Sequence, residues 1–122
     1  MNTNLQERAI EAATRFIERH DYTVLASSWK NPNEECDGRI DLIAKDDDTL
    51  VFIDVTAKNA TCEGFDHGHT PIGVMEILAA EWLALNKPEA DCPVRFDCID
   101  MIVFASDRAL LRHHINARPD IA

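Results

Sequence analysis

The sequence predicts an α/β protein in which helices flank a mixed β-sheet. Apolar residues recur at helical spacing in residues 5–20 and 70–83, with polar residues between them. Residues 38–43, 50–58 and 94–104 instead concentrate Ile, Val, Leu and Phe, which favour strands. Amphipathic helices that alternate with strands bury their apolar faces against a sheet, so the patterns together indicate the α/β class.

The chain has 122 residues and is expected to form a single domain, residues 1–122. Its hydrophobic fraction of 46% is ordinary for a globular protein, and no apolar run is long enough to span a membrane. The first residues lack the basic and apolar regions of a signal peptide, so we expect a cytoplasmic protein without a membrane partner. In that compartment we expect reduced thiols at Cys36, Cys62, Cys92 and Cys98.

The first helix is predicted for residues 5–20, where apolar residues form one stripe. The stripe consists of Ala9, Ala12, Ala13, Phe16 and Ile17. Residues 22–26 then predict a strand, and the following loop, residues 31–35, contains Pro32, which cannot continue it.

A β-hairpin with two carboxylates is the most informative part of the chain. Its arms are residues 38–43 and 50–58, and the acidic residues 46–48 suit the turn between them. Asp41 and Asp54 therefore lie on paired strands and are expected to converge on one divalent metal ion.

One face of the second arm carries polar residues. Because side chains alternate along a strand, Asp54, Thr56 and Lys58 are expected on the same face, with Val55 on the other. Solvated strand-end carboxylates are the alternative interpretation of this pattern, and a solvated lysine is the alternative for Lys58.

The second half of the chain predicts another helix and further strands. Thr70 is expected to cap the helix, with Pro71 in its first position. The apolar stripe of this helix consists of Ile72, Met75, Leu78, Ala79, Trp82 and Leu83. Residues 94–104 predict a strand that enters the sheet, which completes an αβββαβ order, and residues 110–115 are a candidate for an additional edge strand.

Four segments in this order resemble one protein family across most of the chain. They are Gly38-Arg39-Ile40-Asp41-Leu42-Ile43, Val51-Phe52-Ile53-Asp54-Val55, Arg95-Phe96-Asp97, and His113 with Asn116-Ala117. The family consists of small bacterial predicted endonucleases of uncertain function, related to archaeal Holliday junction resolvases and to the PD-(D/E)XK nucleases. The resemblance implies a restriction-endonuclease-like core.

The resemblance also implies a metal site and its chemistry. Asp41, Asp54 and the Val55 carbonyl match the ligands for Mg²⁺ or Mn²⁺. The resemblance also implies a glutamate on the first helix, at the position where Ile10 stands in this chain. Glu7, one turn earlier, is the nearest substitute. If active, the protein would be a Mg-dependent endodeoxyribonuclease acting on branched or single-stranded DNA.

Several residues depart from the family pattern. Thr56 stands where the family carries a catalytic lysine, so Lys58 is the nearest cation that could replace it. Arg39 stands where the family carries glutamate, and it is expected to pair with Asp41 or Asp54. No Lys or Arg occurs between Lys58 and Lys87, where the family's second helix is basic.

These departures and the charge weigh against efficient DNA cleavage. The chain has 12 basic and 22 acidic residues and a formal net charge of −10, which opposes binding to a polyanion. We therefore expect weak or lost phosphodiester cleavage. The alternative is a binding or scaffold protein that keeps the fold and acts through a protein partner or as a homodimer.

A second metal site is possible in the loop before the second helix. Cys62, His67 and His69 are ligand types that zinc accepts, but their spacing matches no established zinc pattern. A solvated polar loop is the alternative.

Overall fold

The computed structural model describes residues 5–32, 38–59, 70–88, 92–105 and 108–116. Within this part of the chain, a five-stranded sheet and two helices follow one another in the order αβββαββ. The predicted α/β fold with a mixed sheet is confirmed. The candidate edge strand near the C-terminal end is present, and it adds one strand to the predicted αβββαβ order.

The elements agree with the sequence patterns to within a few residues. The helices are α1 (Leu5–Arg19) and α2 (Ile72–Asn86), and the strands are β1 (Thr23–Trp29), β2 (Ile40–Asp46), β3 (Thr49–Asn59), β4 (Val94–Ala105) and β5 (Arg108–His114). Each helix has 15 residues, and neither of these described helices is both long and apolar enough to cross a membrane.

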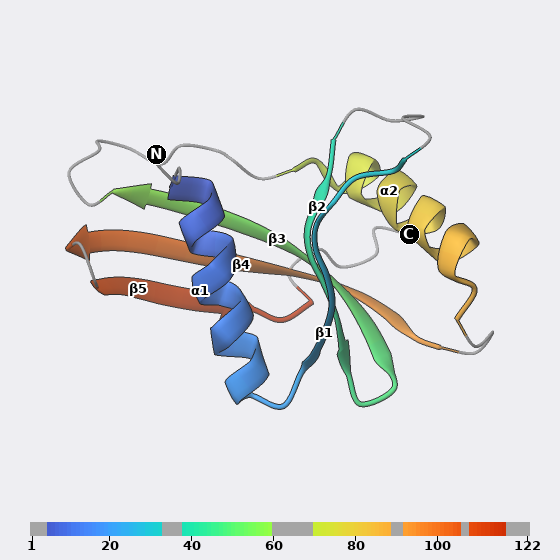
Figure 1. Ribbon diagram of the computed structural model, residues 1–122, viewed down its shortest axis with the longest axis horizontal. Helices are drawn as coiled ribbons and strands as arrows, with labels where there is room; N and C mark the ends of the chain where they lie inside the picture. The colour runs from blue at the N-terminus through green and yellow to red at the C-terminus, as the bar shows by residue number, and fades with distance from the viewer. Residues whose placement is uncertain (1–4, 33–37, 60–69, 89–91, 106–107, 117–122) are drawn as a thin grey trace.

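The strands lie side by side in chain order, β1-β2-β3-β4-β5 (Figure 1). All neighbouring pairs are antiparallel except β3 and β4, which are parallel. A parallel pair needs a crossover connection, and α2 lies in the connection between these two strands. The predicted hairpin therefore consists of the antiparallel strands β2 and β3. Its second strand, β3, also pairs with β4 in parallel.

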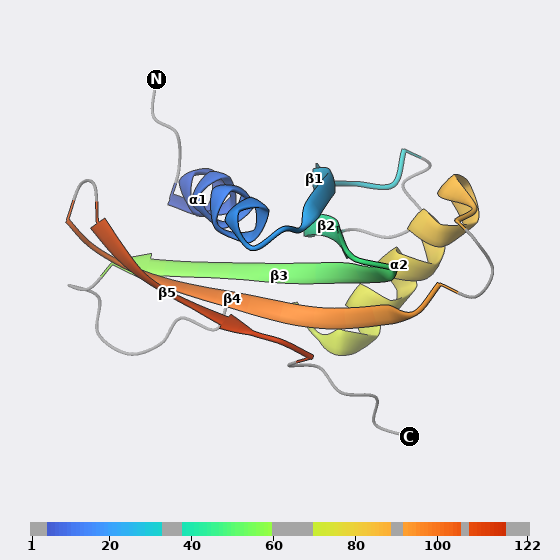
Figure 2. The same ribbon diagram turned by 90° about the horizontal axis from the view of Figure 1, so that it is seen from below.

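Alternation along β3 divides the core between the two faces of the sheet. Ile53 and Val55 pack in one cluster with Ile17 of α1, whereas Phe52 packs in a second cluster with Trp82 of α2. Figure 2 shows α1 on one side of the central strands and the first turns of α2 on the other. Residues adjacent in β3 therefore face different helices, and this decides what each polar side chain of β3 can reach.

The start of α2 differs from the sequence prediction. Pro71, not Thr70, is the N-cap residue, and no side chain caps the helix. The hydroxyl group of Thr70 donates instead to Oδ1 of Asp54, at 3.3 Å, and its backbone N–H donates to Oδ2, at 2.9 Å. Thr70 lies beside the buried carboxylate of Asp54, which requires hydrogen-bond donors. Its polar groups therefore donate to the sheet and do not cap the helix.

Candidate functional site

Asp41 and Asp54 face each other across the β2–β3 hairpin. The register pairs Leu42 with Ile53, so one further step along each strand brings Asp41 opposite Asp54. Opposite residues of an antiparallel pair project from the same face, here the face that α2 covers. Both residues are buried, with exposed fractions of 7% and 2%.

Backbone and side-chain donors of the chain satisfy both carboxyl groups. Oδ2 of Asp41 accepts a hydrogen bond of 2.8 Å from the backbone N–H of Val55. Asp54 accepts the two hydrogen bonds from Thr70 that end at its two oxygens. The pair is therefore built into the hairpin and tied to the start of α2.

The fold favours the protonated form of Asp41. Burial raises the pKa of Asp41 to about 6, and the neighbouring charge of Asp54 and a hydrogen bond between the two carboxyl groups add to this rise. The Val55 N–H and Arg39 act in the opposite direction. Two buried carboxyl groups in contact cannot both ionise without cost, so a proton or another cation is favoured between them.

The Val55 carbonyl, a predicted metal ligand, already has a partner. Nε2 of Gln6, in the first turn of α1, donates to it at 2.7 Å. Sequence reasoning missed Gln6, because only the docking of α1 on β3 reveals a contact between residues 49 positions apart. Glu7, the predicted substitute ligand on the same helix, is solvent-exposed.

Arg39 lies next to Asp41, as the sequence suggested. Its Nε is 4.0 Å from Oδ1 of Asp41, at the limit of an ion pair, and 45% of its side chain is exposed. An arginine at this position places a cation beside the carboxylates.

Thr56 forms a polar contact with the neighbouring strand. Its hydroxyl group donates to Oδ1 of Asp100 on β4, at 2.7 Å, and Oδ2 of Asp100 is 3.1 Å from Nε2 of His114 on β5. Lys58 is half-buried on the same strand, about 13 Å from Asp54 at the usual rise of a strand. Sequence reasoning missed Asp100 and His114, because strand pairing alone brings them to Thr56.

A second polar network lies on the α1 face of the sheet. Asp97 is fully buried and accepts hydrogen bonds from Arg95, from His113 and from the backbone N–H of Asn116. Burial would raise the pKa of Asp97, but the hydrogen bonds from His113 and Arg95 outweigh it and lower the pKa below its usual value. Arg95 also donates to Tyr22, so the network joins β4 and β5 to the residue that precedes β1.

The network contains Arg95, Asp97, His113 and Asn116, which belong to the last two segments of the family resemblance, and it gives them a structural role. In the described part of the chain, no buried side-chain nitrogen or oxygen atom lacks a hydrogen-bond partner. The described residues also contain no group of three or more His, Cys, Asp or Glu side chains that could hold a metal ion. The proposed zinc ligands Cys62, His67 and His69 lie outside the described residues.

Comparison with known proteins places the chain in a family. Residues 10–101 match the model of the uncharacterised protein family UPF0102. The chain belongs to this family. A UPF0102 protein of Beutenbergia cavernae is 31% identical over 106 residues, which cover 83% of this chain and 84% of the relative. A UPF0102 protein of Geobacter sulfurreducens is 29% identical over 119 residues, covering 95% and 89% of the two chains.

The UPF0102 match covers most of the candidate site but not all of it. Asp41, Asp54 and Thr56 lie inside the matched range, whereas Gln6 and His113 lie outside it. A UPF0102 protein of Dechloromonas aromatica is 32% identical over 93 residues, covering 75% of this chain and 72% of the relative.

Proposed function

We propose that this UPF0102 protein binds one divalent metal ion between Asp41 and Asp54 and cleaves phosphodiester bonds of branched or single-stranded DNA weakly. The observation that supports the proposal is the placement of two buried carboxyl groups opposite each other on adjacent antiparallel strands. Such a pair binds either a proton or a cation, because burial makes two uncompensated negative charges costly.

The donor atoms suit a hard cation. Mg²⁺ is commonly held by one or two carboxylates, with water completing its coordination, and Asp41 and Asp54 supply this number. The Val55 carbonyl could join them only by giving up its hydrogen bond from Gln6. When bound, the ion would activate a water molecule and stabilise charge on a phosphate.

The surroundings of the pair explain why the activity would be weak. Thr56 carries no charge, and its hydroxyl group is already committed to Asp100. The Arg39 guanidinium competes with a metal ion for Asp41. The chain's charge of −10 also repels a polyanionic substrate.

A non-catalytic binding protein is the second candidate. The observation in its favour is that donors from Val55 and Thr70 already satisfy Asp41 and Asp54. Buried carboxylates with such partners can serve the fold alone, and in that case the nuclease-like scaffold would act by binding nucleic acid or a protein.

Metal binding is tested by titrating the protein with Mn²⁺ in a calorimeter at pH 7.5. The native chain should bind weakly, Asp54→Asn should abolish binding, and Arg39→Gln should bind about fivefold more tightly. The last figure follows because charges about 4 Å apart interact by about 1 kcal/mol in a water-like surrounding. Lys45→Gln, an equal charge change at an exposed residue of β2, is the matched control.

Cleavage is tested separately with labelled single-stranded and branched DNA in the presence of Mn²⁺. The native protein should cleave slowly, Asp54→Asn should be inactive, and Thr56→Lys should be faster because it places a cation beside the site. A loss of rate in Lys58→Ala would assign that role to Lys58. Metal binding without cleavage by either the native protein or Thr56→Lys would favour the second candidate, and Mn²⁺ binding unaffected by Asp54→Asn would refute the proposed site.

A further inference from the structure

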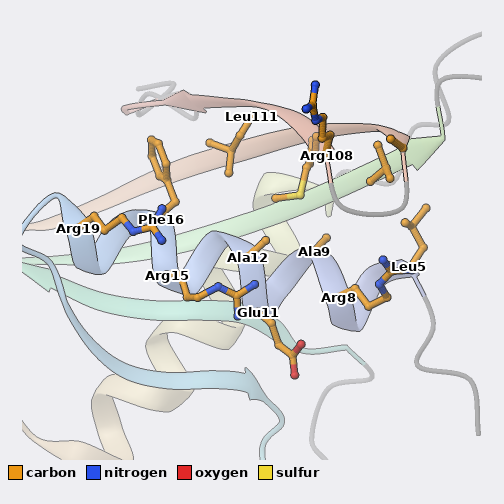
Figure 3. Close-up of a pocket in the computed structure, with 14 residues that line it drawn as sticks. Leu5, Arg8, Ala9, Glu11, Ala12, Arg15, Phe16, Arg19, Arg108 and Leu111 are labelled. Atoms are coloured by element: carbon orange, nitrogen blue, oxygen red, sulfur yellow. The ribbon is translucent and has the colours of Figure 1, made fainter.

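A groove separates α1 from the β4–β5 hairpin on the face of the sheet opposite to Asp41 and Asp54. It has a volume of about 430 Å³, within the range of ligand-binding pockets. Figure 3 shows α1 forming one wall of the groove, with the strands forming the other. None of the residues predicted from the sequence as site residues lines it.

The rim of this groove is basic in an acidic protein. Of the described residues, four arginines line it: Arg8, Arg15 and Arg19 from α1, and Arg108 from β5. They represent a third of the chain's 12 basic residues, although the formal net charge is −10. Glu11 is the only carboxylate among the described lining residues, and in Figure 3 its side chain lies on the side of α1 away from β4 and β5, next to that of Arg15.

Apolar side chains form the floor of the groove, and several of them are small. Four of its described lining residues are alanines, Ala9 and Ala12 from the helix and Ala105 and Ala109 from the hairpin. Leu5, Met101, Val103 and Leu111 complete the apolar lining, and Ala9 itself is buried. Phe16, at the same wall, adds an aromatic ring.

The spacing of the arginines favours an extended ligand with several anionic groups. At 1.5 Å per residue, Arg8 and Arg15 are separated by about 10 Å along the helix axis and Arg15 and Arg19 by about 6 Å. A single phosphate cannot contact all three. Arginine is the cation that binds phosphate in a bidentate manner, and nucleic acid bases stack on aromatic side chains, of which Phe16 is one in the groove.

We propose that this groove binds single-stranded nucleic acid, with the arginines contacting successive phosphates and Phe16 and the apolar lining accepting bases. The inference goes beyond the proposed function, because the groove is separated from the carboxylate pair by the sheet and requires no metal. It assigns a nucleic-acid site to a molecule whose overall charge opposes one, through a local concentration of arginine.

Binding is tested in EDTA by the fluorescence anisotropy of a labelled oligothymidylate of about 12 nucleotides. If all four arginines contact phosphates, the logarithm of affinity should fall with the logarithm of salt concentration with a slope of about −2.8, which is about 50-fold between 50 and 200 mM. The double variant Arg15→Gln/Arg19→Gln should reduce that slope to about −1.4 and weaken binding about tenfold or more.

A matched control separates the groove from general charge. Lys45→Gln/Arg112→Gln removes the same charge from two exposed residues outside the groove, and it should bind like the native protein. Arg108→Gln, on the same strand as Arg112, should weaken binding, while Arg112→Gln alone should not. Glutamine favours helices nearly as well as arginine, and circular dichroism checks that each variant is folded.

The outcomes decide the proposal independently of metal chemistry. Equal weakening in the groove variant and the control variant would overturn it, as would no binding by the native protein at 50 mM salt. Competition by an oligoglutamate of equal charge as strong as that by unlabelled oligothymidylate would show an acidic-peptide site instead. Because EDTA removes the metal, oligothymidylate binding in EDTA would stand even if the Mn²⁺ titration failed.

Discussion

Asp41 and Asp97 show how two buried carboxyl groups of one sheet respond to opposite surroundings. Asp41 lies beside another acid, which adds to the effect of burial and raises its pKa to about 6. Asp97 lies between Arg95 and His113, and their hydrogen bonds lower its pKa in spite of burial. Burial therefore decides the direction of the pKa shift for Asp41, whereas the hydrogen-bond donors around Asp97 reverse it.

At the residue scale, Asp41→Asn should remove a pH dependence of stability. The folded-state pKa of Asp41, about 6, exceeds the unfolded value of about 3.9, so the native protein loses on the order of 3 kcal/mol of unfolding free energy as pH rises through this window. An asparagine can keep the contact with Val55 N–H without the charge. Because about half of this loss occurs below pH 5, urea unfolding should show the stability of the variant relative to the native protein rising by about 1.4 kcal/mol from pH 5 to pH 8.

Glu18→Gln, at an exposed position of α1, is the control for this measurement. It removes one negative charge of the same size and should leave the pH dependence unchanged. If Asp41→Asn and Glu18→Gln behaved alike, general charge reduction and not the buried pair would explain the effect.

At the scale of elements, α2 begins without a side-chain cap because Thr70 serves Asp54. Its first turn also contains Gly73, where an added methyl group would meet no atom within 4 Å. The helix therefore starts at a point where the sequence offers little local stabilisation. Its position depends on the apolar contacts of Met75, Leu78 and Trp82 with the sheet.

Substituting the two described glycines should have opposite effects. Gly73→Ala should raise the free energy of unfolding by about 0.5–1 kcal/mol, because alanine restricts the unfolded chain and favours helix. Gly38→Ala should lower it, because Gly38 has φ +141, a conformation that side chains disfavour, although the space around it is open enough for a methyl group. Chemical denaturation of both variants checks the contrast, and destabilisation by Gly73→Ala would show that the start of α2 is not helical in solution.

At the scale of the whole molecule, the protein is acidic but its groove is lined by basic residues. Of the described acidic residues only Glu11 lines the groove, whereas four arginines, a third of the chain's 12 basic residues, line it. Repulsion among the excess negative charges of the protein opposes folding, and salt screens this repulsion. Salt also weakens contacts between arginine and phosphate.

Salt should therefore act in opposite directions on stability and on binding. At pH 8, adding salt should raise the melting temperature, by roughly 3–6 °C for each kcal/mol of repulsion relieved, while it weakens oligonucleotide binding. At pH 5 salt should raise the melting temperature less, because Asp41 is protonated there and the protein carries less negative charge. Thermal melts at two salt concentrations and two pH values check this, and a melting temperature that falls with salt at pH 8 would contradict it.

The sequence by itself determined the fold class, the order of the elements and the pairing of Asp41 with Asp54. Helical periodicity and strand alternation depend on residues close together in the chain, and a tight hairpin brings its two arms into register without help from distant segments. The pattern of apolar residues in α2 likewise identified its buried face. Four of the six residues predicted for that face, Met75, Leu78, Ala79 and Trp82, are buried, and the other two, Ile72 and Leu83, are half-buried.

Only the tertiary structure decided which groups meet the carboxylates and where the basic residues gather. Gln6 reaches Val55, and Thr56 reaches Asp100, across 49 and 44 positions of sequence. The groove arises because α1 docks mainly on β3 and β1 and leaves a gap beside β4 and β5, which follow it by about 75 residues or more. Contacts of this range depend on how helices dock and strands pair across the whole sheet, and local residue patterns carry no record of that geometry.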